Sequence, residues 1–234
     1  MQAVQRREEA RLAARVGAVN DHAPEPAPGE DGPVPLTLLA SIGDRLRGRT
    51  PSRVEPAPSR AAVAVVLAPA DDDLRLLLIR RAERENDPWS GQMAFPGGRH
   101  NAVNDTSIEA TAIRETREEV GIDLSDAQLL ARLDDVQAHA RGKAVGLVVT
   151  PFLFAVDRPR STVIDPREVA EAIWIPFEVF RDERFHGTTH ISRYGLAASF
   201  PAFLYEGNTV WGMTYRMIQD FLRALEEAAA GEAR

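Results

Sequence analysis

Two apolar runs joined by an acidic turn constrain the fold of this chain more than any other feature. Residues 61–69 read AAVAVVLAP, residues 74–81 read LRLLLIRR, and three aspartates separate them. Short apolar runs bounded by turn residues are typical of buried strands. We therefore predict a buried β-hairpin whose second strand ends at Arg80 and Arg81.

Strand and helix patterns alternate along the rest of the chain. Segments 128–136 and 144–156 have the apolar content of strands around an HARGK loop, and 165–180 runs from an acidic loop into a strand that ends at Pro176. Residues 201–229 combine an aromatic strand and turn with an amphipathic helix. The core-facing stripe of that helix is Trp211, Tyr215, Ile218, Leu222 and Leu225. This alternation predicts a layered α/β domain.

The beginning of the chain has a different composition. Residues 1–34 include a spacer rich in proline, glycine and acidic residues, so we expect a flexible extension; the alternative is an arm that reaches across a dimer partner. Residues 36–48 have leucine and isoleucine at helical spacing and are expected to pack on the main domain. The predicted organisation is an extension over 1–34, a helix and linker over 35–59, and the main domain over 60–234.

Composition limits the classes of binding partner and the cellular compartment that we expect for this chain. The net charge of −7 argues against general binding to nucleic acids or anionic membranes, which requires a basic surface. Without cysteine, disulfides and zinc–thiolate sites are excluded. No segment approaches the roughly 18 apolar residues of a membrane span, and the first residues do not have the pattern of a signal peptide. We therefore expect a cytoplasmic protein.

A helix near residues 106–120 is well marked in the sequence. Thr106 and Glu109 form an S/T-x-x-E capping box, which predicts a start near Thr106. Gly121 is expected to end the helix. The packing stripe consists of Ile108, Ala112, Ile113, Thr116 and Val120. This stripe is expected to face the core.

The other face of this helix is acidic. Glu115, Glu118 and Glu119 have i, i+3, i+4 spacing, so their carboxylates converge within about one turn. Such a face is by itself usually solvated surface. The glycines of the preceding FPGG turn, residues 95–98, let the backbone approach a ligand, and a carbonyl of this turn can join the carboxylates. Oxygen ligands of this kind suit Mg²⁺ or Mn²⁺, which can polarise a phosphate, so we predict a metal site.

These motifs together resemble the Nudix box. The second half of that box reads R-E-U-x-E-E-x-G-U, where U is apolar, and residues 114–122 read RETREEVGI, with Thr116 at the first U. Gly97 and Gly98 match its glycine pair. All fixed positions of the second half are therefore met.

The first half departs from the usual box. The positions that would hold its first glutamate fall on Asn104 and Thr106, and Asp105 is the nearest acidic substitute. The segment from Gly98 to Ile122 is also two residues longer than usual. The resemblance nevertheless implies the Nudix fold, a mixed β-sheet sandwiched between α-helices, and a pyrophosphohydrolase.

The resemblance also assigns a metal site. It implies that Glu115, Glu118, Glu119 and the Gly97 carbonyl bind Mg²⁺ or Mn²⁺.

Two catalytic roles follow from the same resemblance. Arg114 would orient the glutamates by ion pairing, and one of Glu118, Glu119 and Glu168 would deprotonate the attacking water. Glu168 and Glu171, in the acidic loop and strand over 165–180, are both candidates for a further metal ligand or base.

Four residues are expected to bind the substrate. The resemblance implies that Arg80, at the end of the hairpin, reaches the diphosphate, with Arg81 beside it. Gly98 would let the substrate approach the backbone. Trp89 can stack on a base, although core packing is the more common role of a tryptophan.

The substrate is expected to be a small nucleoside diphosphate derivative. Residues 77–82 and 91–98 resemble the two ends of the signature of coenzyme A pyrophosphatases, L-L-T-x-R-[SA]-x3-R-x3-G-x3-F-P-G-G, but the middle does not match: Ile79 replaces the threonine and Asn86 the inner arginine. Coenzyme A is therefore one candidate, and ADP-ribose, NADH and nucleoside triphosphates are others. A non-catalytic nucleotide-binding protein and a homodimer also stay open.

Overall fold

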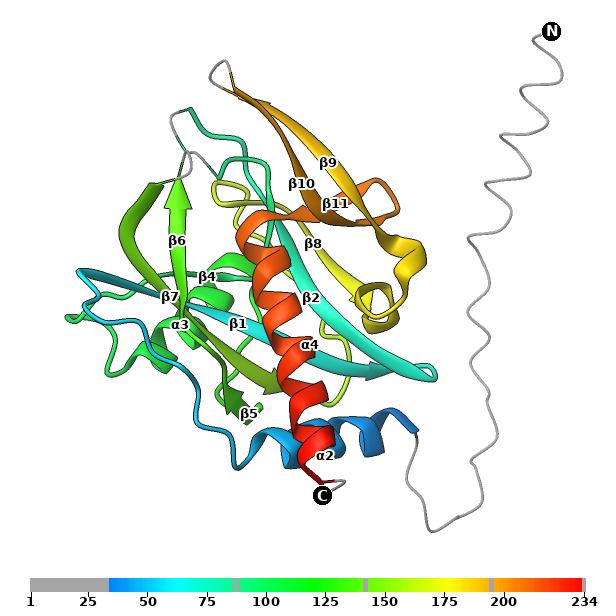
Figure 1. Ribbon diagram of the computed structural model, residues 1–234. Coiled ribbons are helices and arrows are strands. Elements are labelled where there is room, and N and C mark those ends of the chain that lie inside the picture. The colour runs from blue at the N-terminus through cyan, green and yellow to red at the C-terminus, as the bar shows by residue number, and fades with distance from the viewer. Residues whose placement is uncertain (1–33, 86, 88, 141–142, 194–195, 233–234) are drawn as a thin grey trace, which may run out of the picture. The chain divides into compact units, whose positions relative to one another are not determined.

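The computed structural model describes residues 34–232 apart from 86, 88, 141–142 and 194–195 (Figure 1). The predicted extension lies outside these residues except for Val34, and so does the centre of the predicted HARGK loop. None of the described helices combines the length and apolarity needed to cross a membrane.

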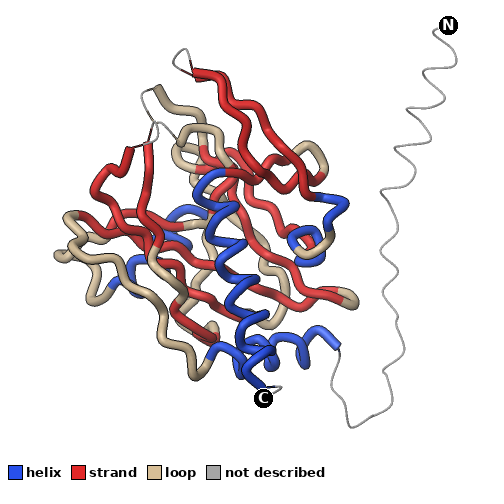
Figure 2. Tube along the Cα trace, in the orientation of Figure 1, coloured by secondary structure: helices blue, strands red, loops and turns tan. Residues whose placement is uncertain are grey.

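Helices and strands alternate along the described chain (Figure 2). In chain order the elements are α2 (Val34–Leu46), β1 (Ser59–Ala70), β2 (Asp73–Arg81), β3 (Met93–Ala94), β4 (Gly97–Arg99), α3 (Ile108–Val120), β5 (Gln128–Arg132), β6 (Val136–Ala140), β7 (Lys143–Ala155), β8 (Val169–Pro176), the 3₁₀ turns η1 (Phe177–Phe180) and η2 (Glu183–Phe185), β9 (His186–Arg193), β10 (Leu196–Tyr205), β11 (Asn208–Trp211) and α4 (Gly212–Glu232).

The predicted hairpin is the centre of an eight-stranded sheet. β1 and β2 pair antiparallel across a turn in which Asp71 has a φ of 53°. The strand order is β3-β2-β1-β7-β5, with β4 on β1, β6 on β7 and β8 on β2. β1 and β7 run parallel, with Ser59 opposite Leu147, whereas the other described pairs of this sheet are antiparallel. The sheet is therefore mixed, as predicted.

Helices cover both faces of this sheet, because alternate side chains of β1 point to opposite faces. Ala62 and Ala64 belong to one core with residues of α3. Val63 and Val65 belong to a second core, to which α2 and α4 contribute. In Figure 1, α4 crosses one face of the sheet and α3 lies on the other. The predicted sandwich of a mixed sheet between helices is confirmed.

α3 has the predicted end and starts near Thr106 as predicted, but with a different cap. Its N-cap is Ser107, whose Oγ accepts a hydrogen bond from the Ala110 N–H at 3.0 Å, so the capping box predicted at Thr106 is wrong. Gly121 ends the helix in the left-handed conformation, with a φ of 72°. The stripe residues Ala112, Thr116 and Val120 are fully buried, as predicted.

Two other segments differ from the expectation. Residues 97–99 form the short strand β4 instead of a tight turn, because Gly97 and Gly98 pair with Val63 and Ala62 of β1. Residues 128–136 are split between β5 and β6, since the buried Asp135 accepts a hydrogen bond from Thr150 of β7 at 2.7 Å and interrupts the strand. A separate three-stranded sheet in the order β11-β10-β9 was not predicted.

Candidate active site

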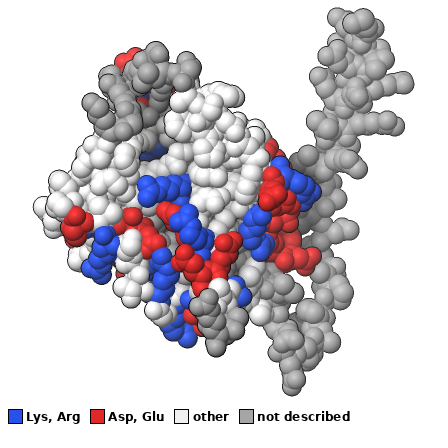
Figure 3. Space-filling view, in the orientation of Figure 1, with Lys and Arg blue, Asp and Glu red and all other residues white. Residues whose placement is uncertain are grey.

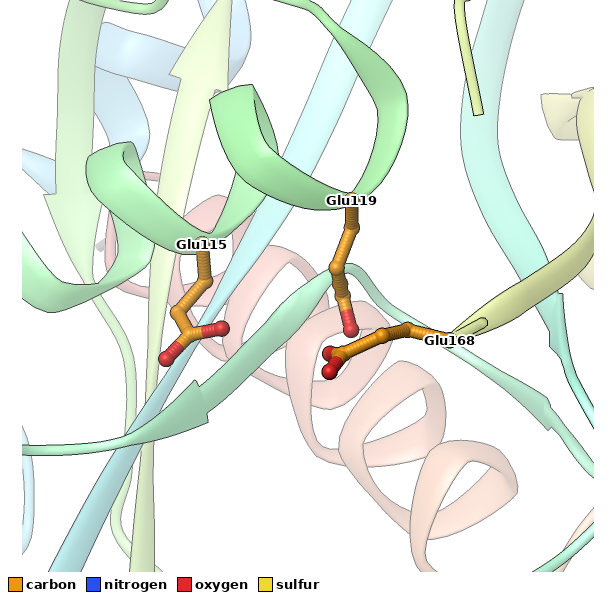
Figure 4. A group of neighbouring side chains, drawn as sticks. All are labelled: Glu115, Glu119 and Glu168. Atoms are coloured by element: carbon orange, nitrogen blue, oxygen red, sulfur yellow. The ribbon is translucent and has the colours of Figure 1, made fainter. Parts of the chain in front are cut away.

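Three carboxylates converge beside the C-terminal half of α3. Glu115 and Glu119 lie on neighbouring turns of the helix, and Glu168 reaches them from the segment before β8 (Figure 4). One oxygen of each lies within 4.8 Å of the others. We call these three residues the acidic trio. Glu118, predicted as a metal ligand, is not in the trio, whereas Glu168 is.

Backbone hydrogen bonds hold Glu168 in this position. The carbonyl oxygens of the last two residues of α3 accept hydrogen bonds from the N–H groups of Val163 and Asp165, at 2.9 and 3.0 Å. Arg84 adds a hydrogen bond to the Arg167 carbonyl at 3.0 Å and approaches the Glu168 carboxylate at 3.4 Å. The segment before β8 is thus tied to the end of the helix that carries the other two members of the trio.

Burial has the largest effect on the pKa values of Glu119 and Glu115. Glu119 is 2% exposed, and its carboxylate accepts a hydrogen bond from the Gly97 N–H at 2.9 Å. Burial raises the pKa of Glu119 to about 8, although the Gly97 hydrogen bond opposes this effect. Burial also raises the pKa of Glu115, against the opposing charge of Arg114. A divalent cation at this point would stabilise the ionised carboxylates.

Arg114 connects the trio to the loop before α3. Its Nη1 is 2.9 Å from the carboxylates of both Glu115 and Glu118. Its other nitrogens bind Asp105, the residue predicted as the nearest acidic substitute in the box. These hydrogen bonds hold the pKa of the buried Asp105 carboxyl well below its usual range. The charged Asp105 therefore fixes the guanidinium that contacts two of the glutamates.

Because Gly97 and Gly98 have no side chains, Glu115 can lie close to one of them and β1 close to the other. A Cβ atom on Gly98 would lie 2.5 Å from a carboxylate oxygen of Glu115. A Cβ atom on Gly97, whose φ is 155°, would lie 2.3 Å from the Ala62 carbonyl oxygen. Any larger residue would displace either the trio or β1.

The trio opens into a cavity of about 660 Å³, a volume typical of sites for small molecules. Glu118, Gly97, Gly98, Trp89 and Arg81 are among the residues that line it. The structure thus brings most of the residues predicted from the sequence to one cavity.

The two neighbouring arginines of β2 differ in their placement. Arg81 lines the cavity, binds Asp87 at 2.9 Å and has a buried Nε without a partner among the described residues. Arg80, which was expected to reach the diphosphate, instead binds Glu171 at 2.9 Å and Asn208 at 2.7 Å and does not line the cavity. Of these two arginines, only Arg81 therefore lines the cavity, as Arg99 and Arg167 also do.

The C-terminal helix contributes to the cavity, which the sequence did not predict. Met213, Thr214 and Met217 of α4 line the cavity, as do Leu147 and Val149 of β7. The core-facing stripe predicted for α4 is confirmed at the fully buried Ile218, whereas Trp211, predicted as part of it, ends β11. No motif marks Met213, Thr214 or Met217, and the left-handed Gly212 that starts the helix is their nearest sequence signal.

Surface charge agrees with a small-molecule site. Figure 3 shows acidic and basic side chains interspersed over the viewed face, without a broad basic area. A surface that binds nucleic acid would gather basic residues.

Comparisons with known proteins agree with this geometry. The family model described as NUDIX domain matches residues 58–193. The human mitochondrial coenzyme A diphosphatase NUDT8 is 32% identical over 197 residues, 83% of this chain and 76% of that protein. The peroxisomal coenzyme A diphosphatase ndx-8 of Caenorhabditis elegans is 30% identical over 143 residues, 61% and 57% of the two chains. An uncharacterized Schizosaccharomyces pombe protein is 36% identical over 160 residues, 60% of this chain, which spans about half of that relative's length (46%).

Proposed function

This chain belongs to the Nudix family, and from that premise we propose that it is a Mg²⁺- or Mn²⁺-dependent pyrophosphohydrolase for nucleoside diphosphate derivatives, with coenzyme A as its substrate. The observation that carries the proposal is the acidic trio at the wall of a cavity that Arg81 also lines. Two relatives named as coenzyme A diphosphatases support the choice of substrate. Both are named as organellar, and a cytoplasmic location of this chain stays a prediction.

The donor set fits a hard divalent cation. Three carboxylate oxygens within 4.8 Å of one another, one of them from a side chain that is 2% exposed, match the oxygen ligands that such ions prefer. Glu115, Glu119 and Glu168 would hold the ion, together with the Gly97 carbonyl predicted from the sequence. When bound, the ion polarises the phosphate and makes a nearby water more acidic.

The remaining groups bind the substrate and move the proton. Arg81 binds a phosphate oxygen through the guanidinium that faces the cavity. Glu118 lies in the wall outside the trio, with Oε2 bound to Arg114, so we assign its Oε1 as the acceptor of the water proton. The water oxygen adds to one phosphorus, the bridging P–O bond breaks, and the two products are phosphate monoesters.

A substrate panel tests the proposal. Hydrolysis of coenzyme A, ADP-ribose, NADH and nucleoside triphosphates is measured with Mg²⁺ or Mn²⁺ for the wild type, Glu119→Gln and Glu171→Gln. We expect metal-dependent cleavage, highest kcat/KM for coenzyme A, loss of turnover in Glu119→Gln, and little change in Glu171→Gln, because Glu171 binds Arg80 outside the cavity. Binding without cleavage of any member would contradict the catalytic proposal.

A further inference from the structure

A second cavity, of about 490 Å³, lies between α2, the later part of α4 and the segment that runs from η1 to the start of β9. Figure 1 shows α2 beside the end of α4, and the two helices are in contact. The volume is in the range of sites for small molecules. None of the residues that line this second cavity also lines the cavity of the acidic trio, so the two are separate places on the described chain.

Helical spacing explains how two helices form this cavity together. The lining residues of α2 have i, i+3, i+4, i+7 spacing: Leu38, Ser41, Ile42 and Arg45. Four lining residues of α4 have the same spacing: Gln219, Leu222, Arg223 and Glu226. Residues at this spacing share one face of a helix. Each helix therefore brings both apolar side chains and one arginine to the second cavity.

The apolar surface of the second cavity comes mainly from partly buried leucines. Leu38, Leu222 and Leu225 pack against the core on the α4 side of the sheet without being fully covered. Phe177 and Phe180 of η1 also line the cavity and are 1% and 0% exposed. A ligand with an apolar body would remove the leucine surface from water, which favours binding.

The charged side chains of the second cavity are mostly cationic: three arginines, Arg45, Arg181 and Arg223, against one carboxylate, Glu226. Nη2 of Arg181 is 3.1 Å from Asp73, and Nη1 of Arg223 is 3.3 Å from Asp220. Arg45 forms no ion pair among the described residues. A guanidinium has five N–H donors, so Arg181 and Arg223 keep donors beyond those that face these aspartates.

We propose that the second cavity is a binding site for a small amphipathic anion, whose carboxylate or phosphate group contacts the arginines and whose apolar chain covers the leucines. Guanidinium groups bind either head group through paired, charge-assisted hydrogen bonds. A neutral molecule with the same chain would form only the apolar contacts. The proposal does not depend on the proposed function, because the two cavities share no lining residue.

An NMR titration of isotope-labelled protein tests the proposal with octanoate, octyl phosphate, butyrate and neutral octanamide. We expect saturable shifts of backbone amides in α2 and in α4 from Gln219 onward. The Kd of octanoate should be lower than that of butyrate, by up to about fourfold for each added methylene that becomes buried. Octanamide should bind at least about tenfold more weakly, and the comparison of octanoate with octyl phosphate identifies the preferred head group. Equal binding of octanamide and octanoate, or shifts confined to the cavity of the trio, would overturn the proposal.

Two arginines of α4 offer a matched pair of variants. Arg223 and Arg216 are 62% and 58% exposed and both lie near Asp220, at 3.3 and 3.6 Å, but only Arg223 lines the second cavity. Because both side chains are exposed, we expect both variants to keep the wild-type fold, which their amide spectra check. Arg223→Gln should raise the Kd of octanoate about tenfold, since it removes a charged donor, whereas Arg216→Gln should leave it unchanged. The same Kd in both variants would show that the second cavity is not the site.

Discussion

Arg114 and Asp105 form a bidentate ion pair. Nε of Arg114 lies 2.6 Å from Oδ1 of Asp105, and Nη2 of Arg114 lies 3.0 Å from Oδ2 of Asp105. The Asp105 side chain is only 1% exposed. Because two nitrogens are fixed in this way, Nη1 is directed to the carboxylates of Glu115 and Glu118. The ion pair with Asp105 thus helps to position the carboxylates of Glu115 and Glu118.

Replacing Asp105 by asparagine should damage both stability and turnover. The variant removes the most buried of the three carboxylates that pair with the partly buried Arg114, so we expect the free energy of unfolding to fall by about 3 kcal/mol. Since the glutamates lose their fixed neighbour, kcat should fall by about 10- to 100-fold. Urea unfolding and steady-state kinetics measure the two effects. The control is Asp126→Asn, which weakens a pair between the exposed Asp126 and Arg160 and should change the stability much less.

Glu119→Gln should stabilise the metal-free protein at high pH. The pKa of about 8 in the folded state lies above the ordinary value of 4.5, so the stability contributed by protonated Glu119 is complete below pH 4.5 and is lost as the pH rises through 8. A neutral glutamine does not titrate. In EDTA we therefore expect a higher Tm for the variant at pH 9 and almost equal Tm values at pH 5. A lower Tm of the variant at pH 9 would contradict the burial argument.

Metal affinity of the wild type should increase with pH. A cation at the trio displaces the proton of Glu119, so its apparent Kd should fall by up to about tenfold per pH unit below the pKa and level off above pH 8. Titration calorimetry with Mn²⁺ in buffers of different ionisation enthalpy should also detect release of a proton. A Kd that is constant between pH 6 and 8 would show that Glu119 is not a ligand.

Gly121→Ala should reduce turnover by displacing Glu168. Gly121 has a φ of 72°, and a Cβ atom there would lie 3.1 Å from Val163, in the segment that leads to Glu168. We expect a loss of about 1 to 2 kcal/mol in stability from the left-handed backbone and a fall in kcat. Gly207→Ala is a matched control, because Gly207 has a φ of 77° but nothing within 4 Å of the added atom. It should lose similar stability and keep its kcat.

The two arginines of β2 should respond differently to alanine substitution. Arg81→Ala removes the guanidinium from the cavity and is expected to raise KM at least about tenfold. Arg80→Ala removes a pair with Glu171 in which both side chains are substantially exposed, so KM should hardly change. A larger rise in KM for Arg80→Ala than for Arg81→Ala in steady-state kinetics would instead support the prediction from the sequence that Arg80 reaches the diphosphate.

The different placement of Arg80 and Arg81 could not be predicted from the sequence. The apolar runs and the helix pattern predicted the hairpin, α3 and α4, because these depend on local periodicity. A strand turns successive side chains to opposite faces, and the pairing of β2 with β8 shifts register between these two arginines, so their placement depends on tertiary structure. The same holds for Glu168, which joins the trio through backbone hydrogen bonds to α3 that no motif encodes.

The parallel pairing of β1 with β7 has a consequence for the order of folding. Ser59 pairs with Leu147, so the whole of α3 lies within the connection between the two strands. Closing so long a connection costs chain entropy before the contacts between β1 and β7 can form. The pairing of these two strands is therefore expected to be a slow step of folding. Glu168 follows β7 in the chain. During synthesis the three carboxylates therefore cannot meet until β7 and the segment that carries Glu168 have emerged, so the complete trio is available to a metal ion only late in synthesis.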